Sequence, residues 1–406
     1  MPKPQMSLTK KVNLQFAAVQ SSYWMTFFPI SGFAVVLLQS KNFTGSEIGV
    51  ILSLQYAASI FAQPLISSFS SRNPHIALKN IVITMLLIGA GISSILFFLP
   101  HLFLPAILIF MIIGMTEMST PAFLNAIAMQ ITNSGVKLNY GVARGLGSLS
   151  FALLGVGLGK LVDLAGTNTI IPVFILTVLI ACFFLSRLYA PAPKESPEDG
   201  DAILTVMPQT SIWTFLRSNK AYTGFCVASG LIFASHACIN TFLPNIMDAL
   251  GGTAADQGIT RSIAAAFEIP IMFAYSFVAR RISSNKLLII SAFSFFLKAL
   301  ATMLVPGVAF MFMIQIFQLS GFGLYTTAAV HYSDKAVSDV DRVRSQAISM
   351  VAGIGIGNVI GNLGGGIMID RWGIHGLLLA ACALSFTGFV VMFLFLGEKK
   401  RDRLSQ

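Results

Sequence analysis

The chain has few charged residues and few cysteines. Only 10% of its 406 residues are Asp, Glu, Lys or Arg, whereas an ordinary soluble domain carries about 25%. A water-soluble protein of this length needs more polar side chains to cover its surface. We therefore exclude a soluble enzyme, a disordered chain and a nucleic-acid binder. The 4 cysteines are scattered through apolar runs and have neither the spacing of a disulfide framework nor that of a metal site.

The sequence consists mainly of long runs of apolar residues. Hydrophobic residues make up 55% of the chain, and a membrane-spanning helix needs about 20 mostly apolar residues. A polar stretch rich in proline and acidic residues divides the runs into two sets. We therefore predict an all-α integral membrane protein, with twelve transmembrane helices in two pseudo-symmetric six-helix bundles (1–189 and 218–406) and a cytoplasmic linker (190–217). The twelve runs are 14–38, 46–70, 79–99, 103–131, 139–162, 168–189, 218–247, 256–279, 286–306, 308–333, 345–369 and 374–396.

The basic residues alternate between the two ends of these runs. Most of the 26 Lys and Arg residues fall on the side of the N-terminus, and only Lys41, Lys160 and Arg371 fall in segments on the opposite side. Lys and Arg are enriched in cytoplasmic loops. We therefore expect a multi-pass protein of the cell membrane with both termini in the cytoplasm. No small-residue cleavage site follows the first apolar run, so we expect no cleavable signal peptide.

Two sequence patterns recur at almost the same interval. An acidic residue followed by x-Gly opens one predicted helix at Glu47 and another at Asp256, 209 residues later. A Gly-x-x-x-Asp-x-x-Gly pattern ends two other helices, with its aspartate at Asp163 and at Asp370, 207 residues later. Both intervals are close to half the chain length, which indicates a duplicated six-helix unit. Parallel repeats of this kind occur in major facilitator transporters.

Ionisable side chains inside the predicted helices are candidates for proton coupling. Each costs about 2.5–3.5 kcal/mol at the centre of a spanning helix, so it needs a partner or a wet cavity. Glu268 and Lys298 lie at similar depth on successive predicted helices. They form either a structural ion pair or a coupling site. Glu117 and His236 are the other candidates, and hydrogen-bonded packing is the alternative role for His236.

Polar and aromatic residues at mid-depth outline a candidate binding cavity. Amides bond to hydroxyl groups and flat rings stack on the apolar faces of sugars or bases, so such a set suits an uncharged, hydroxylated solute. Interhelical hydrogen bonding is the alternative role for each residue taken singly. The predicted substrate-binding residues of this kind are Tyr23, Trp24, Asn125, Asn240, Gln315 and Gln318.

Several segments resemble a known transporter family. The runs Thr44–Ile51 and Gln63–Leu65 resemble the helix 1–2 region of the lactose permease branch of the major facilitator superfamily. The run Tyr140–Ser148 resembles the helix 5 signature of that branch, which nucleoside permeases carry in modified form. Glu268–Pro270 resembles a helix 8 segment that this branch shares with sugar efflux transporters. The resemblance implies the major facilitator fold.

The same resemblance implies roles for individual residues. Arg144 would be the sugar-binding arginine, and Phe151 would be the stacking aromatic residue. Glu268 would be the helix 8 carboxylate, and Lys298 stands where that branch has an arginine. Arg144 and Phe151 therefore join the candidates for substrate binding, and the resemblance gives Glu268 and Lys298 a place among the coupling residues as well.

The sequence also departs from that branch. Asn125 replaces the helix 4 carboxylate that partners the arginine, and Gln318 and Gly321 replace the helix 10 His and Glu. The loop between the second and third helices reads Ser70-Ser71-Arg72 and lacks the usual Asp. These departures weigh against lactose itself and against the exact proton pathway of that branch.

We therefore predict a secondary active transporter and not an enzyme. It would move a small neutral solute, which is a sugar, an oligosaccharide or a nucleoside, by alternating access around a central site, with proton-coupled uptake as the first hypothesis. The sequence has no nucleotide-binding loop, so we expect no cofactor and a proton gradient as the energy source. A sugar or drug exporter of the same fold and a non-transporting solute sensor are the alternatives. The expected partners are the small-molecule substrate and the lipid bilayer, with no nucleic acid, and we expect a monomer.

Overall fold

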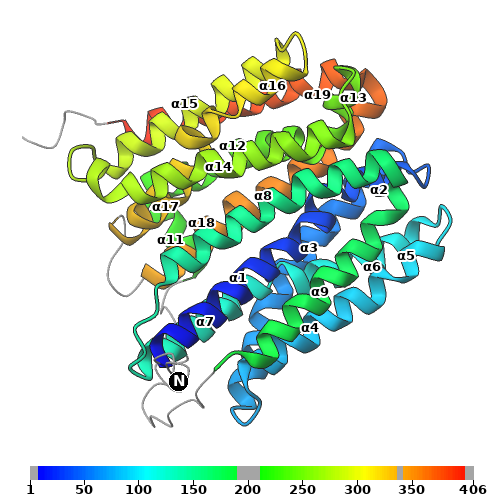
Figure 1. The fold of residues 1–406 in the computed structure, drawn as a ribbon. Helices are drawn as coiled ribbons and strands as arrows, with labels where there is room; N and C mark the ends of the chain where they lie inside the picture. Colours follow the sequence, from blue (N-terminus) through cyan, green and yellow to red (C-terminus); the bar gives the residue numbers. More distant parts are fainter. Residues whose placement is uncertain (1–7, 190–210, 336–341, 398–406) are drawn as a thin grey trace, which may run out of the picture. The chain divides into compact units, whose positions relative to one another are not determined.

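The computed structural model describes residues 8–189, 211–335 and 342–397, and the regular structure in these ranges is helical (Figure 1). The chain divides into two compact units. Unit 1 comprises Met1–Ala202 and Gly251–Ser262, and unit 2 comprises Ile203–Leu250 and Ile263–Gln406. Residues 190–210 of the predicted linker lie outside the described residues. The predicted domain limits therefore stay a prediction.

Unit 1 contains the first six predicted spans, some of them as broken helices. Helix α1 packs on α8 and α9, α3 packs on α6, and α4 packs on α6 and α9. The elements are α1 (Leu8–Gly32), α2 (Ala34–Gln39), α3 (Gly45–Arg72), α4 (Leu78–Ser93), α5 (Ile95–Phe98), α6 (Phe103–Glu117), α7 (Thr120–Asn133), α8 (Tyr140–Ala165), η1 (Thr167–Thr169) and α9 (Ile170–Arg187).

Unit 2 contains the other spans, together with a short helix that precedes them. Helix α12 packs along α19, and α15 packs on α19 and α17. The elements are α11 (Ile212–Ser218), α12 (Lys220–Thr241), α13 (Leu243–Ala249), α14 (Ala254–Val278), α15 (Ser284–Met303), α16 (Val308–Ile314), the π-helical turn η2 (Leu319–Gly323), α17 (Leu324–Lys335), α18 (Arg342–Met350), the π-helical turn η4 (Val351–Gly357) and α19 (Asn358–Leu396). The first turns of α14 belong to unit 1.

Proline and glycine set two of the helix breaks. Pro121 has no N–H, and its ring clashes with the carbonyl of the residue four positions earlier, which is Glu117. Helix α6 accordingly ends at Glu117, and α7 begins at Thr120. Gly373 interrupts α19 with a φ of 65°, a conformation that residues with a Cβ rarely adopt.

The described helices account for all twelve predicted runs. Nine helical segments in the described ranges are long and apolar enough to cross a membrane. The last of them, Arg344–Leu396, has 53 residues and is divided at Gly373, so it is long enough for two spans of about 20 residues. Helices α1 and α14, with 25 residues each, cover the two remaining runs. The predicted all-α architecture is confirmed.

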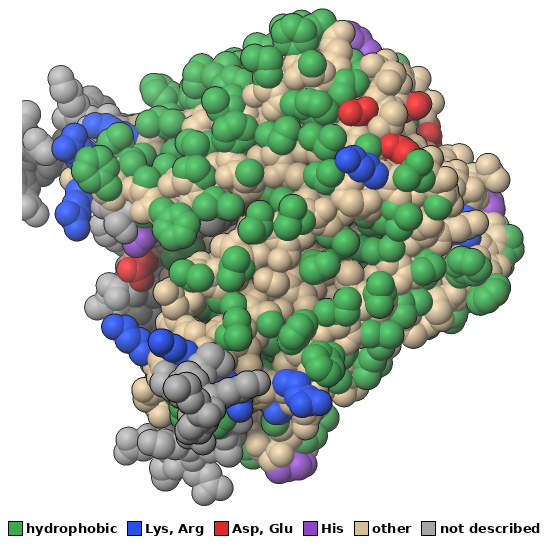
Figure 2. Space-filling model, in the orientation of Figure 1, with side chains coloured by type: hydrophobic (Ala, Val, Ile, Leu, Met, Phe, Trp, Pro, Cys, Tyr) green, Lys and Arg blue, Asp and Glu red, His purple; other side chains and the backbone are tan. Residues whose placement is uncertain are grey.

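The surface of the molecule is largely apolar. Leu164 is 87% exposed in unit 1 and Phe273 is 69% exposed in unit 2, and hydrophobic side chains cover much of the visible surface (Figure 2). Lipid tails are as apolar as these side chains, so their exposure carries no penalty in a bilayer. The core of unit 2 is aromatic and includes Phe225 and Phe233, which are almost completely buried.

Candidate functional site

In unit 1, Glu117 lies inside the helix bundle at the break between α6 and α7. Its side chain is 1% exposed, and the Thr26 hydroxyl on α1 donates to its Oε2 across 3.0 Å. Tyr23, one turn earlier on α1, donates to the main-chain carbonyl of Glu117 across 2.8 Å. That carbonyl has no helical partner because Pro121 lacks an N–H. The other carboxylate oxygen, Oε1, has no hydrogen-bond partner among the described residues.

Arg144 and Trp24 stack on each other in the same unit. The guanidinium carbon of Arg144 lies 3.9 Å from the centre of the Trp24 ring, and its Nη1 donates to the hydroxyl of Ser148 across 2.8 Å. Trp24 donates its indole N–H to the Oε1 of Gln20 across 3.1 Å. Helices α1 and α8 come close enough for this because Gly147 has no side chain: a Cβ there would lie 2.6 Å from the Trp24 ring.

The arrangement combines a cation, a flat aromatic ring, an amide and a hydroxyl in one place. The sequence predicts both Arg144 and Trp24 as substrate-binding residues, and the structure brings the two together. Such a combination of planar apolar surface and fixed hydrogen-bonding groups suits a solute with hydroxyl groups. A cation over an indole face is the most favourable form of cation–π contact.

Phe151 and Asn125, the other two substrate-binding candidates of unit 1, have contacts with other residues than Arg144 and Trp24. Phe151 packs its ring edge on Phe28, with 4.6 Å between the ring centres. Asn125 is exposed on α7 and accepts a hydrogen bond from the Tyr140 hydroxyl across 2.6 Å. Neither contact tests the substrate-binding role, which stays a prediction for both residues.

In unit 2, one amide connects the two predicted coupling charges. The ammonium group of Lys298 donates to the Oε1 of Gln318 across 2.7 Å. The Nε2 of Gln318 donates in turn to the Oε1 of Glu268 across 2.9 Å. Lys298 is 3% exposed and Gln318 is 4% exposed. Gln318 thus bonds to both of the residues that the sequence pairs, and their role in proton coupling stays a prediction.

The π-helical turn η2 explains how these three helices meet. Gln318 immediately precedes the turn, and the Ser291 hydroxyl on α15 donates to the carbonyl of Gly321 within it across 2.8 Å. Gly323 closes the turn against α14: a Cβ there would lie 3.3 Å from the Cα of Glu268. Local π-helical turns are frequent at functional sites. The turn thus places Gln318 between the helices that carry Glu268 and Lys298.

His236 and Asn240 form a second polar pair in unit 2. The Nδ2 of Asn240 lies 2.5 Å from the Nε2 of His236, and the imidazole ring stacks on Phe322 with 5.2 Å between ring centres. Gln315 is buried, and its Nε2 donates to the carbonyl of Met311 on its own helix across 3.0 Å. His236 is thus hydrogen-bonded and packed on an aromatic ring, and its role in proton coupling stays a prediction.

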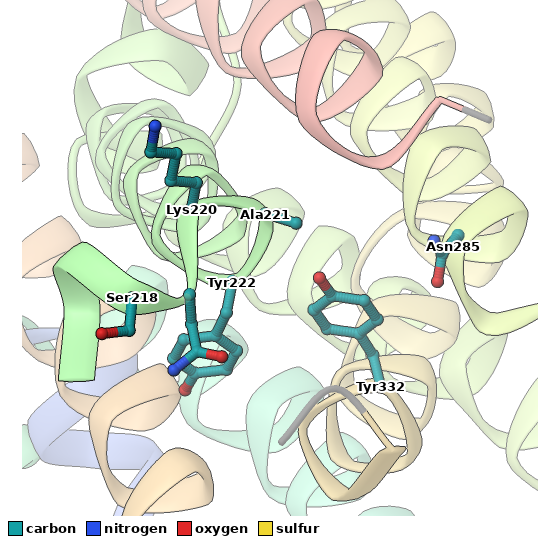
Figure 3. Close-up of a pocket in the computed structure, with 7 residues that line it drawn as sticks. Ser218, Lys220, Ala221, Tyr222, Asn285 and Tyr332 are labelled. Atoms are coloured by element: carbon teal, nitrogen blue, oxygen red, sulfur yellow. The ribbon is translucent and has the colours of Figure 1, made fainter. Parts of the chain in front are cut away.

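A polar cavity of about 470 Å³ lies at the end of unit 2 where α12 and α15 begin. Figure 3 shows the Tyr332 ring from α17 and the Tyr222 ring from α12 on different sides of it. The cavity contains none of the predicted site residues. Its lining residues are Ser218, Asn219, Lys220, Ala221, Tyr222, Asn285 and Tyr332.

Sequence reasoning missed the residues that hold the candidates in place. Thr26 lies one turn from Tyr23, and that spacing puts both on one face of α1. The Gly-Phe-Gly sequence at 321–323, which begins three residues after Gln318, is the corresponding signal for η2. The bridging role of Gln318 has no such signal, because it depends on the distances to α14 and α15.

Comparison with known proteins decides the family. The MFS_1 like family matches residues 19–379. The chain belongs to this family. It is thus a multi-pass membrane transporter of the major facilitator type and not an enzyme, as predicted. The uncharacterized transporter YwbF of Bacillus subtilis (strain 168) is 26% identical to the chain, over 98% of the chain and 97% of the relative. The maltose permease of Geobacillus stearothermophilus is 24% identical, over 94% of the chain and 94% of the relative.

Solved structures confirm the fold of this family member. The nucleoside transporter NupG is similar with a TM-score of 0.74 and 18% identity, over 96% of the chain and 98% of that structure. An auto-inhibited peptide transporter of the POT family has a TM-score of 0.72 and 9% identity, over 95% of the chain and 96% of that structure. The predicted major facilitator fold is confirmed.

Proposed function

We propose that the protein takes up a small neutral sugar or oligosaccharide together with a proton, by alternating access. The observation that carries the proposal is the stacked pair of Arg144 and Trp24, with Gln20 and Ser148 bonded to it. Its groups can bond to several hydroxyls while the aromatic and guanidinium planes contact apolar ring faces. A relative at 24% identity is named maltose permease, which supports the same substrate class.

The proposed coupling group is Glu268. When its carboxylate is ionised, the Gln318 amide satisfies both Glu268 and the ammonium of Lys298. When Glu268 binds a proton, its negative charge is removed from one end of this chain of hydrogen bonds while the buried ammonium group of Lys298 stays at the other end, so the interaction between the two groups changes. Proton binding and the arrangement of α14, α15 and η2 are therefore linked. The distribution of Lys and Arg supports a cytoplasmic location for both termini. We further propose that the protein works as a monomer and that the proton gradient is its energy source.

Proteoliposomes with the purified protein test both parts. We expect radiolabelled maltose to accumulate under an imposed inward proton gradient, with glucose and uridine measured in parallel. The Glu268→Gln variant should lose accumulation but retain exchange of labelled for unlabelled sugar, because it fixes the uncharged form. Asp248→Asn, an exposed carboxylate at the end of α13, is the matched control and should accumulate sugar normally.

Three outcomes would contradict the proposal. Accumulation by Glu268→Gln equal to that of the unmodified protein would exclude this residue as the coupling group, and Glu117→Gln would then be examined. Transport of uridine but not of sugars would exclude the proposed substrate class. Binding of sugar without exchange would favour a sensor over a transporter of that solute.

A further inference from the structure

Asp163 holds the first turn of α14 against α8 within unit 1. Its Oδ1 accepts the main-chain N–H of Ala254, and its Oδ2 accepts that of Ala255, both across 2.9 Å. The first N–H groups of a helix have no partner within the helix. A carboxylate at this position also interacts favourably with the helix dipole. One side chain of α8 thus takes up two of the free donors of α14.

Helix α14 has its own cap in addition. The main-chain N–H of Thr253 donates to Asp256 across 2.9 Å, and that of Asp256 donates to the Thr253 hydroxyl across 3.3 Å. Thr44 and Glu47 form the same reciprocal cap at the start of α3, at the position that the internal repeat predicts. This cap satisfies two N–H groups from within the helix itself. The contact with Asp163 is therefore additional to the helix's own cap, and it joins two segments of the chain.

The rest of the contact is built from main-chain approaches and buried polar bonds. A Cβ on Gly258 would lie 2.2 Å from the carbonyl oxygen of Gly155 on α8. Gln257 donates to the carbonyl of Gly32 at the end of α1, and Ser262 donates to that of Ala152 on α8, both across 2.6 Å. The first nine residues of α14 are thus seated closely on α8 and α1.

The same helix carries the proposed coupling carboxylate. Residues up to Ser262 belong to unit 1, whereas residues from Ile263 onward belong to unit 2, and Glu268 lies six residues beyond Ser262. Both positions lie on the one helix α14, which also contains Pro270. The first turns of α14 and the proposed coupling carboxylate are therefore connected through a single helix.

We propose that Asp163 is a releasable latch, whose two hydrogen bonds to Ala254 and Ala255 keep the start of α14 on α8 and must break for α14 to move. The latch requires that α14 can leave α8 as an intact helix, because its own cap stays with it. Movement of helices is inherent in transport by this family, and the latch is independent of which solute or ion is carried.

Alkylation of a reporter cysteine tests the latch without any transport assay. The four native cysteines are replaced by alanine in the full-length protein, and Ser262→Cys introduces a reporter that is buried while α14 is seated, since Ser262 is 8% exposed. We expect Asp163→Asn to increase the rate of labelling by N-ethylmaleimide on the order of tenfold, because asparagine has no charge and only one acceptor oxygen for the two N–H groups. Asp256→Asn, which alters only the helix's own cap, is the matched control and should change the rate less than about twofold.

Two results would overturn the latch. Equal labelling rates with and without the Asp163 carboxylate would show that the contact does not hold the helix. An equal increase in Asp256→Asn would show fraying of the helix end instead of release from α8. If Asp163→Asn also lowers the unfolding temperature, labelling of the Asp163→Glu variant separates a loss of stability from a loss of the latch. Slow labelling of Asp163→Glu supports a latch that needs a carboxylate. Fast labelling of Asp163→Glu contradicts it.

Discussion

The hydroxyl of Tyr23 takes the place of a main-chain N–H on the carbonyl of Glu117. The two groups are 2.8 Å apart, and Tyr23 is completely buried. The carbonyl needs this donor because Pro121, four residues later, has no N–H to offer. The break between α6 and α7 at Pro121 and the Tyr23 side chain on α1 therefore belong to one arrangement. It holds the Glu117 side chain next to Thr26.

Tyr23→Phe is expected to destabilise the protein. The variant keeps the ring and leaves the buried carbonyl of Glu117 without a donor, which costs about 1–3 kcal/mol. Thermal unfolding of the purified protein in detergent measures the loss. Tyr140→Phe is the matched control, because the Tyr140 hydroxyl bonds to Asn125 at an exposed site where water can replace it.

Pro121→Ala provides a second and sharper test of the same arrangement. Alanine restores an N–H that can bond to the Glu117 carbonyl, so Tyr23→Phe should cost less in that background. We expect a coupling of about 0.5–1.5 kcal/mol between the two substitutions in a double-mutant cycle. Strict additivity would show that the proline and the tyrosine act independently.

Gln318→Leu should be more damaging than the same substitution one turn away. It removes one acceptor of Lys298 and one donor to Glu268 at once. Hydrogen bonds to charged groups contribute about 1.5–3 kcal/mol each, and we expect a loss of about 2–4 kcal/mol. Gln315→Leu removes the same amide where it bonds only to the carbonyl of its own helix, and should cost less than about 1 kcal/mol. Similar unfolding temperatures for the two variants would contradict the bridging role.

Arg144→Lys is expected to weaken sugar binding on the order of tenfold or more. Lysine keeps the charge but loses the planar fork that stacks on Trp24 and bonds to Ser148 at the same time. Isothermal titration with maltose measures the dissociation constant. Arg187→Lys is the matched control, since Arg187 lies over Phe183 at the end of α9 with 5.3 Å from its guanidinium carbon to the ring centre. Equal affinity in both variants would argue against a substrate contact at Arg144.

Periodicity and length predict the helices well, but they do not predict which side chains meet. The runs around Glu117 and Glu268 follow from hydrophobicity, because a spanning helix must be mostly apolar. The candidate pairs depend on helix breaks and close approaches. Pro121 and Gly147 are visible in the sequence, but the partners that they admit, Tyr23 and Trp24, lie on another helix. The bridge through Gln318 likewise requires the π-helical turn η2, which a regular helical pattern does not predict.

Gly373 and Gly364 on α19 should respond differently to substitution by alanine. Gly373 has a φ of 65° and a ψ of −164°, a region that is essentially restricted to glycine, and forcing a residue with a Cβ into it costs on the order of 1–3 kcal/mol. A Cβ on Gly364 would meet no atom within 4 Å, and alanine in a helix is favoured over glycine by roughly 0.5–1 kcal/mol. We therefore expect Gly373→Ala to lower the unfolding temperature and Gly364→Ala to leave it unchanged or raise it. A stable Gly373→Ala variant would mean that α19 runs as one continuous helix, and the division of Arg344–Leu396 into two spans would then be wrong.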